Sequence, residues 1–173
     1  VCMRWFMTSL VFLVSIMTTQ AQWTLQLTSR SIMGMPGLQS FAAAEFSGRW
    51  IFVGGRTDGL HQRQPPRSFL ASERNDRIWL VDPVSGSVKS APTSTLPVDL
   101  ADQLSSTNVE FEHIGTKLYV VGGYGYSRTA GDHATFNAMI IVDLPKLIQE
   151  IERGALTEAP FKRIVDDRLA VTG

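Results

Sequence analysis

Cysteine is almost absent from this chain of 173 residues, and its single copy is Cys2. One cysteine cannot form an internal disulfide, so the fold must be held by packing and hydrogen bonds. Charge of one sign is lacking as well, because 16 Lys and Arg residues balance 16 Asp and Glu residues. That balance excludes the broad basic surface that nonspecific nucleic-acid binding requires, so we expect no nucleic-acid partner.

Several enzyme signatures are also missing. The chain has no Gly-x-Ser-x-Gly elbow, no Walker loop, no His-Glu-x-x-His motif and no sialidase-type Asp box. The sequence therefore carries none of these signatures, and further parts of a longer protein could still supply catalytic residues.

The sequence contains no apolar run of the roughly 20 residues that a membrane helix needs. The run from Trp5 to Met17 is shorter, follows the positive charge of Arg4 and leads to small residues ending at Ala21. This order predicts a secretory signal peptide over residues 1–21, cleaved near Ala21. An uncleaved anchor is the alternative. We therefore expect a secreted or cell-surface protein with no stable membrane insertion after cleavage and no cysteine in its mature part.

What the chain does contain is an internal repeat. The segment 49–55 reads Arg-Trp-Ile-Phe-Val-Gly-Gly, and the segment 117–123 reads Lys-Leu-Tyr-Val-Val-Gly-Gly. Each copy is followed by a second apolar run that ends in aspartate, at Asp82 and at Asp143. Repeated units of this length are typical of propellers and other arrays. We expect each aspartate to cap a turn.

Strand signals dominate both copies. Residues 40–46 and 108–114 precede the double-glycine strands, and alternate apolar and polar residues in 108–114 indicate a strand in which His113 is buried. A turn around Gly86 leads into a fourth strand at 87–91. Residues 22–27 alternate in the same way and predict a further, half-buried strand.

Two short helices are expected between strands. In residues 144–154, Pro145 suits a helix start, apolar residues share one face and Gly154 suits the end. The helix is therefore inserted between the third and fourth strands of the second unit. Residues 97–104 predict a second, shorter helix.

These units resemble the Kelch family of β-propellers, and most of all its secreted bacterial members. The resemblance rests on four apolar positions followed by Gly54-Gly55 and by Gly122-Gly123, with an apolar third strand at a matching distance. The aromatic residues that typical Kelch repeats carry after the double glycine are not clearly placed here. The resemblance implies an all-β fold, a partial propeller with two four-stranded antiparallel blades at 36–92 and 108–163.

Two blades are fewer than the 4–8 that propellers use, so we interpret the sequence as an N-terminal fragment. A strand beginning at Arg168 would then start a third blade. The strand at 22–27 would complete the last blade of the closed ring, which is not in this sequence.

Candidate binding residues lie on the two long connections that follow the double-glycine strands. Both should open on one face of a four-stranded meander, where long polar loops on a rigid scaffold usually carry function. Arginine next to tyrosine suits sugar hydroxyls, carboxylates or a protein partner. The predicted binding residues are Arg56, Asp58, His61, Arg63, Tyr124, Tyr126, Arg128 and His133.

Each of these residues also has a purely structural interpretation. Arg56 and Asp58 could form an ion pair that closes the loop, and the two tyrosines could pack between blades. His61 and His133 with a nearby aspartate could ligate a metal, but their spacing is not compact, so we predict no metal and no cofactor. We favour a non-catalytic extracellular protein for adhesion or scaffolding that recognises carbohydrate or protein through this loop face. The alternative is a carbohydrate-active hydrolase, isomerase or oxidase that shares its catalytic residues with further blades.

Overall fold

The computed structural model of the chain describes residues 23–29, 31–59 and 68–170. The chain divides into two units, Val1–Arg30 and Ser31–Gly173, and all of the described helices and strands belong to the second unit. The predicted signal peptide, with Cys2, lies outside the described residues.

The first unit does not contain the predicted strand. Residues 23–29 form no helix or strand, and the side chains of Trp23, Leu25 and Leu27 are exposed. Gln22 lies outside the described part of the chain. The prediction is wrong for residues 23–27 because alternation supplies one apolar face, whereas a strand also needs a partner for its backbone N–H and C=O groups.

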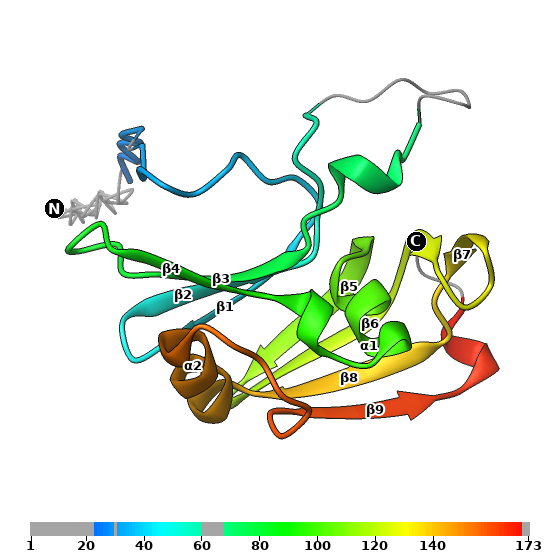
Figure 1. Cartoon of the computed structure of the whole chain (residues 1–173). Helices are drawn as coiled ribbons and strands as arrows, with labels where there is room; N and C mark the ends of the chain where they lie inside the picture. Colours follow the sequence, from blue (N-terminus) through cyan, green and yellow to red (C-terminus); the bar gives the residue numbers. More distant parts are fainter. Residues whose placement is uncertain (1–22, 30, 60–67, 171–173) are drawn as a thin grey trace, which may run out of the picture. The chain divides into compact units, whose positions relative to one another are not determined.

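The second unit is mostly β and contains two antiparallel sheets (Figure 1). The first sheet has strand order β1-β2-β3-β4, with each strand hydrogen-bonded to the next along the chain. Its strands are β1 (Ala42–Phe46), β2 (Arg49–Val53), β3 (Arg77–Val81) and β4 (Val88–Pro92). They confirm the four strands that the sequence predicts for the first repeat.

The second sheet repeats this order and adds a strand. Its main path is β5-β6-β8-β9, and β7 pairs with the far end of β6. The strands are β5 (Thr107–Ile114), β6 (Lys117–Ser127), β7 (Asp132–Thr135), β8 (Ala138–Asp143) and β9 (Phe161–Val165). The all-β class is thus confirmed, with sheets of four and five strands.

The extra strand corrects the prediction of a long loop after Gly123. β6 continues to Ser127 and forms a hairpin with β7, and Gly131, at φ 71°, lies in the turn. The turn closes with the Gly131 N–H donating to the Ser127 carbonyl at 2.8 Å. Tyr124 and Tyr126 alternate with small residues, which is a strand pattern that aromatic residues favour.

Two helices confirm the predicted ones. α1 (Val98–Leu104) follows β4, and α2 (Leu144–Arg153) is inserted between β8 and β9. Asp143 caps α2, because its carboxylate accepts from the Lys146 N–H, and Gly154 ends the helix at φ 81°. Short 3₁₀ turns occur at Ala71–Glu73, Thr93–Thr95 and Asp167–Leu169. Because Asp167–Leu169 is a 3₁₀ turn, the strand expected from Arg168 does not begin there, and residues 171–173 lie outside the described part.

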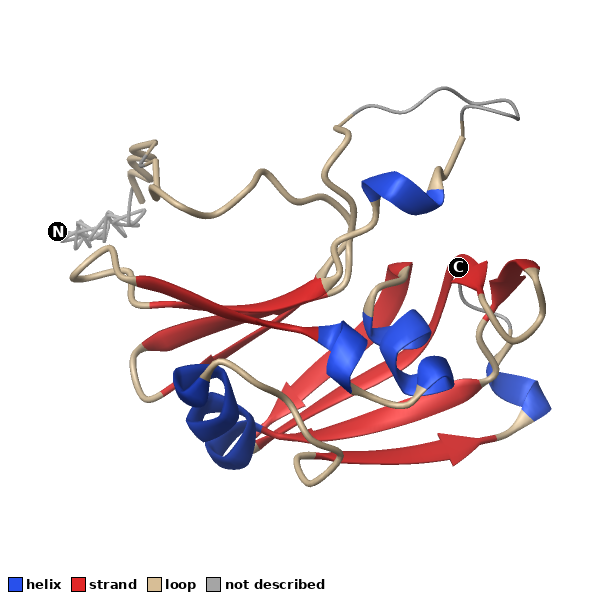
Figure 2. Ribbon diagram, viewed as in Figure 1, coloured by secondary structure: helices blue, strands red, loops and turns tan. Residues whose placement is uncertain are grey.

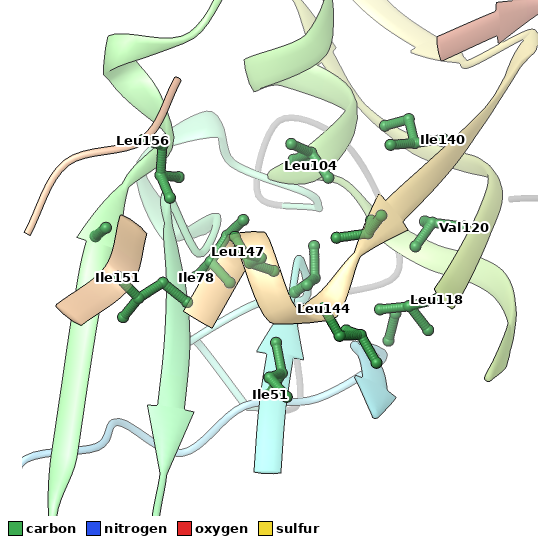
Figure 3. Packing of buried hydrophobic residues seen from close by; sticks show 14 of the residues in the cluster. Ile51, Ile78, Leu104, Leu118, Val120, Ile140, Leu144, Leu147, Ile151 and Leu156 are labelled. Carbon is green, nitrogen blue, oxygen red and sulfur yellow. The ribbon is translucent and has the colours of Figure 1, made fainter. Parts of the chain in front are cut away.

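The core lies where the two sheets and both helices meet (Figure 3). The inward side of β2 and β3 meets the side of β6 and β8 that carries Leu118 and Ile140, and the apolar face of α2 closes one end through Leu144 and Leu147. The largest fully buried apolar side chains are Ile51, Ile78, Leu104, Leu118, Ile140, Leu144, Leu147 and Ile151. His113 does not belong to this core, contrary to expectation. It is half-buried, and Phe111 and Ile114 on the same strand are exposed. The Nε2 of His113 lies 2.9 Å from the Gly115 carbonyl.

The sheet surfaces that face away from this core are also apolar. On the first sheet, Phe52 pairs with Trp79, and Trp50, two residues from Phe52, is 42% exposed. On the second sheet, Tyr119 pairs with Ile141, and both side chains are half-buried. We call these two surfaces the outer faces.

Candidate functional site

Antiparallel strands place the β2–β3 connection, α1 and the β6–β7 hairpin at one end of the sheets (Figure 2). The opposite end carries short turns and α2. We call the first the loop end, and define it as the described residues of the segments 54–76, 93–106, 124–137 and 166–170. All the predicted binding residues belong to these segments, except His61 and Arg63, which lie outside the described part.

The double glycines bring the strand ends close to Ser106. All four glycines have positive φ, from 66° at Gly122 to 92° at Gly123. A Cβ atom on Gly54 would lie 2.5 Å from the Ser106 carbonyl oxygen, and one on Gly123 would lie 2.6 Å from Val109 Cγ1. The Gly55 N–H donates to that same Ser106 carbonyl at 2.8 Å. The motif is therefore required by conformation and by close packing.

Side-chain amides bind the same strand ends. Asn75 Nδ2 donates to the Gly54 carbonyl at 2.8 Å. Gln103 Nε2 donates to the Gly122 carbonyl at 3.2 Å and to the Ala138 carbonyl at 2.7 Å. Both amides are buried. The two sheets thus use equivalent hydrogen bonds, one from within the β2–β3 connection and one from α1.

Arg56 forms an ion pair with Asp58, which is the structural alternative that the sequence analysis gave for these two residues. Its Nε and Nη2 donate to the Asp58 carboxylate at 3.0 and 2.6 Å. Its guanidinium also lies 5.3 Å from the centre of the Phe69 ring. The Arg56 residue is buried, at 4% exposure, so this guanidinium shapes the loop and offers little surface to a ligand.

The tyrosines and His133 pack together in an aromatic cluster. Tyr124 meets Phe69 edge-on, with ring centres 5.1 Å apart, and stacks on His133 at 5.8 Å. Tyr126 meets His133 edge-on at 5.5 Å. His133 Nε2 lies 2.7 Å from the Phe69 carbonyl, so this nitrogen carries the proton. The cluster ties the β6–β7 hairpin to the β2–β3 connection.

Arg128 is held by a residue that the sequence analysis missed. Asp102 of α1 is 2% exposed, and its carboxylate accepts from both Nε and the backbone N–H of Arg128 at 2.8 Å. Arg74 Nη1 adds a longer contact at 3.4 Å. No sequence pattern marks Asp102, because its partners come from segments far along the chain in either direction.

These contacts leave little space between them. A cavity of about 10 Å³ lies among Arg56, Asp102, Tyr124 and their neighbours, which is room for about one water molecule. The structure therefore brings six of the predicted residues, Arg56, Asp58, Tyr124, Tyr126, Arg128 and His133, together with Phe69 and Asp102, but it packs them against one another.

An open groove lies beside this cluster, with a volume of about 550 Å³. It is bordered by the β6–β7 hairpin, the start of α1, β9 and the 3₁₀ turn at Asp167. We call it the β7 groove and define it by the polar residues Asp99, Thr129, Thr135, Asn137, Arg163 and Asp167. Sequence reasoning identified none of these six.

Hydrogen bonds hold five of the six polar side chains that define the β7 groove. Thr129 Oγ1 donates to Asp99 at 2.5 Å, and Asn137 Nδ2 donates to Asp167 at 2.7 Å. Arg163 Nε donates to the buried Oε1 of Gln103 at 3.2 Å. The groove thus combines acceptors, hydroxyls and one guanidinium in fixed positions.

Within residues 23–29, 31–59 and 68–170, no three His, Cys, Asp or Glu side chains lie close enough together to hold a metal ion. None of the described helices has the length and apolar character needed to span a bilayer. Comparison with protein-family models gives no match, and comparison with curated proteins gives none either.

Proposed function

We propose that this chain is part of an exported Kelch-type β-propeller that binds a carbohydrate or a protein through its loop end, without catalysing a reaction. The observation that carries the proposal is the relation between the two repeats. Aligning the double-glycine strands makes Ile51 equivalent to Tyr119 and Trp50 equivalent to Leu118.

Several positions that are buried in one sheet have equivalents that lie on the outer face of the other sheet. The first sheet buries Ile51 and Leu80, and their equivalents Tyr119 and Ile141 lie on the outer face of the second sheet. Conversely, Leu118 is fully buried, whereas its equivalent Trp50 is 42% exposed. Each outer face thus repeats a surface that is already buried between the two sheets. Further sheets of the same kind, stacked in a ring, would cover both outer faces.

The propeller is tested by Ile141→Ala in the full-length protein. If another blade covers this face, the substitution costs about 2–5 kcal/mol of unfolding free energy, as expected for a buried isoleucine. Chemical denaturation measures the loss, and Leu80→Ala is the matched control, because Leu80 is the buried equivalent. A loss for Ile141→Ala below half of that for Leu80→Ala would contradict the propeller.

The contrast between the two ends of the sheets supports binding at the loop end. The loop end has long polar connections held by ion pairs and aromatic contacts, and the opposite end has tight turns and the helix α2. Rigid elements that present polar loops are the usual platform for recognition. Export is consistent with an extracellular ligand.

Binding is tested by blocking one end at a time. In a Cys2→Ser background, Leu70→Cys places one thiol at the loop end and Val84→Cys places one at the opposite end, both at exposed positions. Each thiol is coupled to a bulky polyethylene glycol, and binding is measured on glycan and extracellular-protein arrays. We expect loss of binding only for the polymer at position 70. Equal binding by both conjugates would contradict recognition by the loop end.

Export is tested separately by mass spectrometry of the secreted protein. We expect an N-terminus at Gln22. An intact N-terminus recovered in the membrane fraction would contradict cleavage.

A further inference from the structure

We propose that the β7 groove is a binding subsite for a neutral saccharide. This inference rests on the proposed function and gives it a location and a ligand class. The residues that the sequence suggested for binding are largely engaged: Arg56 is paired with Asp58, Arg128 is held by Asp102, and the aromatic rings pack on one another. The β7 groove is the adjacent space at the loop end that remains open.

The volume of the β7 groove suits a small ligand. At about 550 Å³ it falls within the range of roughly 300–1,000 Å³ that is typical of ligand sites. Four apolar residues, Ala130, Ala134, Phe136 and Ala170, also line it. Small apolar patches among polar groups match a sugar ring, whose C–H faces need apolar contact and whose hydroxyls need polar partners.

The donors and acceptors of the groove match hydroxyl groups. Arg163 is half-buried and uses its Nε for Gln103, and within the described part of the chain no carboxylate lies at ion-pair distance from it. Its Nη groups can therefore donate to ligand oxygens. Asp99 and Asp167 each receive one hydrogen bond and keep further lone pairs that can accept from ligand hydroxyls.

The groove carries charges of both signs, with two carboxylates and one guanidinium. Because the carboxylates outnumber the guanidinium, an anionic ligand such as a uronic acid is disfavoured overall, and an amine is disfavoured where it lies beside Arg163. A neutral polyol meets neither penalty, because each hydroxyl can both donate to a carboxylate and accept from the guanidinium. Hydrogen bonds within the protein also orient several of these groups before binding, which lowers the entropy cost of ordering them.

The test uses the full-length protein and defined probes. Cellobiose, lactose, maltose and N,N′-diacetylchitobiose represent neutral saccharides, and galacturonic acid and glucosamine are the charged comparators. Ligand-observed NMR detects weak binding, and calorimetry gives the Kd. We expect at least one neutral disaccharide to bind more tightly than either charged probe. Binding of no neutral probe, or tighter binding of a charged one, would overturn the inference.

Two variants assign the binding to the groove. Arg163→Met removes the donor, and we expect it to weaken binding of the neutral saccharide about tenfold or more, as for loss of a charge-assisted hydrogen bond. Thr135→Val removes one hydroxyl with almost no change in shape, and we expect a several-fold loss. Thr116→Val, at the opposite end, is the matched control and should bind like the wild type.

The variants also separate this inference from the proposed function. If Arg163→Met fails to fold because Gln103 loses its partner, Thr135→Val still decides the question. A saccharide that binds equally well to Thr135→Val and to the wild type would place the site elsewhere. The polymer block at position 70 would then still show whether the loop end binds, whatever happens in the β7 groove.

Discussion

The two sheets of this protein carry the same repeat, yet they bury opposite sides of it. Ile51 and Leu80 of the first sheet are in the core, and their equivalents Tyr119 and Ile141 of the second sheet lie on an outer face. Conversely, Leu118 is fully buried, and its equivalent Trp50 is 42% exposed. Both sides of both sheets are nevertheless apolar. The comparison teaches that the neighbouring sheet, rather than the residue type, decides which positions are buried here.

The largest expected effect tests this comparison directly in residues 22–173. Leu118→Ala removes buried methyl groups and should lower the free energy of unfolding by about 2–5 kcal/mol. Trp50→Ala, at the equivalent position, removes a larger side chain that is partly in water, and it should cost less than half as much. Chemical denaturation measures both. Equal losses would show that the outer face of the first sheet is covered even in this part of the chain.

The second prediction concerns the double glycine. Gly54 and Gly48 have similar positive φ values, 68° and 74°, so replacing either by alanine strains the backbone by roughly 1–2 kcal/mol. Only at Gly54 would the new Cβ also meet a backbone atom, the Ser106 carbonyl oxygen at 2.5 Å; at Gly48 it meets nothing within 4 Å. We therefore expect Gly54→Ala to destabilise the protein clearly more than Gly48→Ala. Equal thermal unfolding of the two variants would contradict the close approach to Ser106.

Much of this fold could be predicted from the sequence, because its signals are local. Period-two alternation marks β5, apolar runs mark β2 and β6, and the proline and glycine at either end mark α2. The β7 strand was missed because Gly125 and Gly131 are typical of loops. The residues 23–27 show the opposite error, since alternation alone cannot supply a partner strand.

The candidate site was far less predictable, because its contacts join distant segments. Arg56 and Asp58 lie two residues apart, and their pairing could be proposed from the sequence. Arg163 donates to Gln103 of α1, and Arg128 donates to Asp102 of the same helix. Both contacts join residues far apart in the sequence, which only the tertiary fold brings together. No local pattern carries that information.

The third prediction tests the two buried amides that hold equivalent strand ends. Gln103→Ala leaves two carbonyls of buried residues, Gly122 and Ala138, without this donor, and Arg163 Nε without its acceptor. Asn75→Ala leaves one carbonyl of a buried residue, Gly54, together with the N–H groups of the half-buried Arg77 and Trp79. A buried polar group without a partner costs about 1–3 kcal/mol. We expect both variants to be destabilised within this range, with the larger loss for Gln103→Ala. The reverse order in denaturant melts would contradict the role of α1 in holding the second sheet.

The smallest expected effect concerns Asp82 and Asp143, the aspartates that follow or end the third strand of each repeat. Both side chains have a lowered pKa, but for different reasons. The Ser85 hydrogen bonds lower the pKa of Asp82 first of all, and the hydrogen bond from Lys117, at 2.7 Å, does so for Asp143. A lowered pKa in the folded state contributes stability above the ordinary aspartate pKa, near 4, and this contribution is lost as the pH falls through the folded value.

Replacing Lys117 should therefore separate the two aspartates. Lys117→Met removes the Lys117 hydrogen bond, which is the main cause of the lowered pKa of Asp143. The pKa of Asp143 should therefore rise toward its ordinary value, while that of Asp82 stays low. The ion pair is only partly exposed, with side-chain exposures of 38% for Lys117 and 22% for Asp143, and solvent still screens it, so the change in stability at neutral pH should be about 1 kcal/mol. Carboxyl-carbon NMR titration measures both pKa values in one sample, and Ser85→Ala is the converse variant, expected to raise the pKa of Asp82 alone. If Lys117→Met left the pKa of Asp143 unchanged, the backbone N–H of Lys146 at the start of α2 would be the main stabiliser of that carboxylate. The two turns would then be capped in the same way, by backbone donors, despite their different lengths.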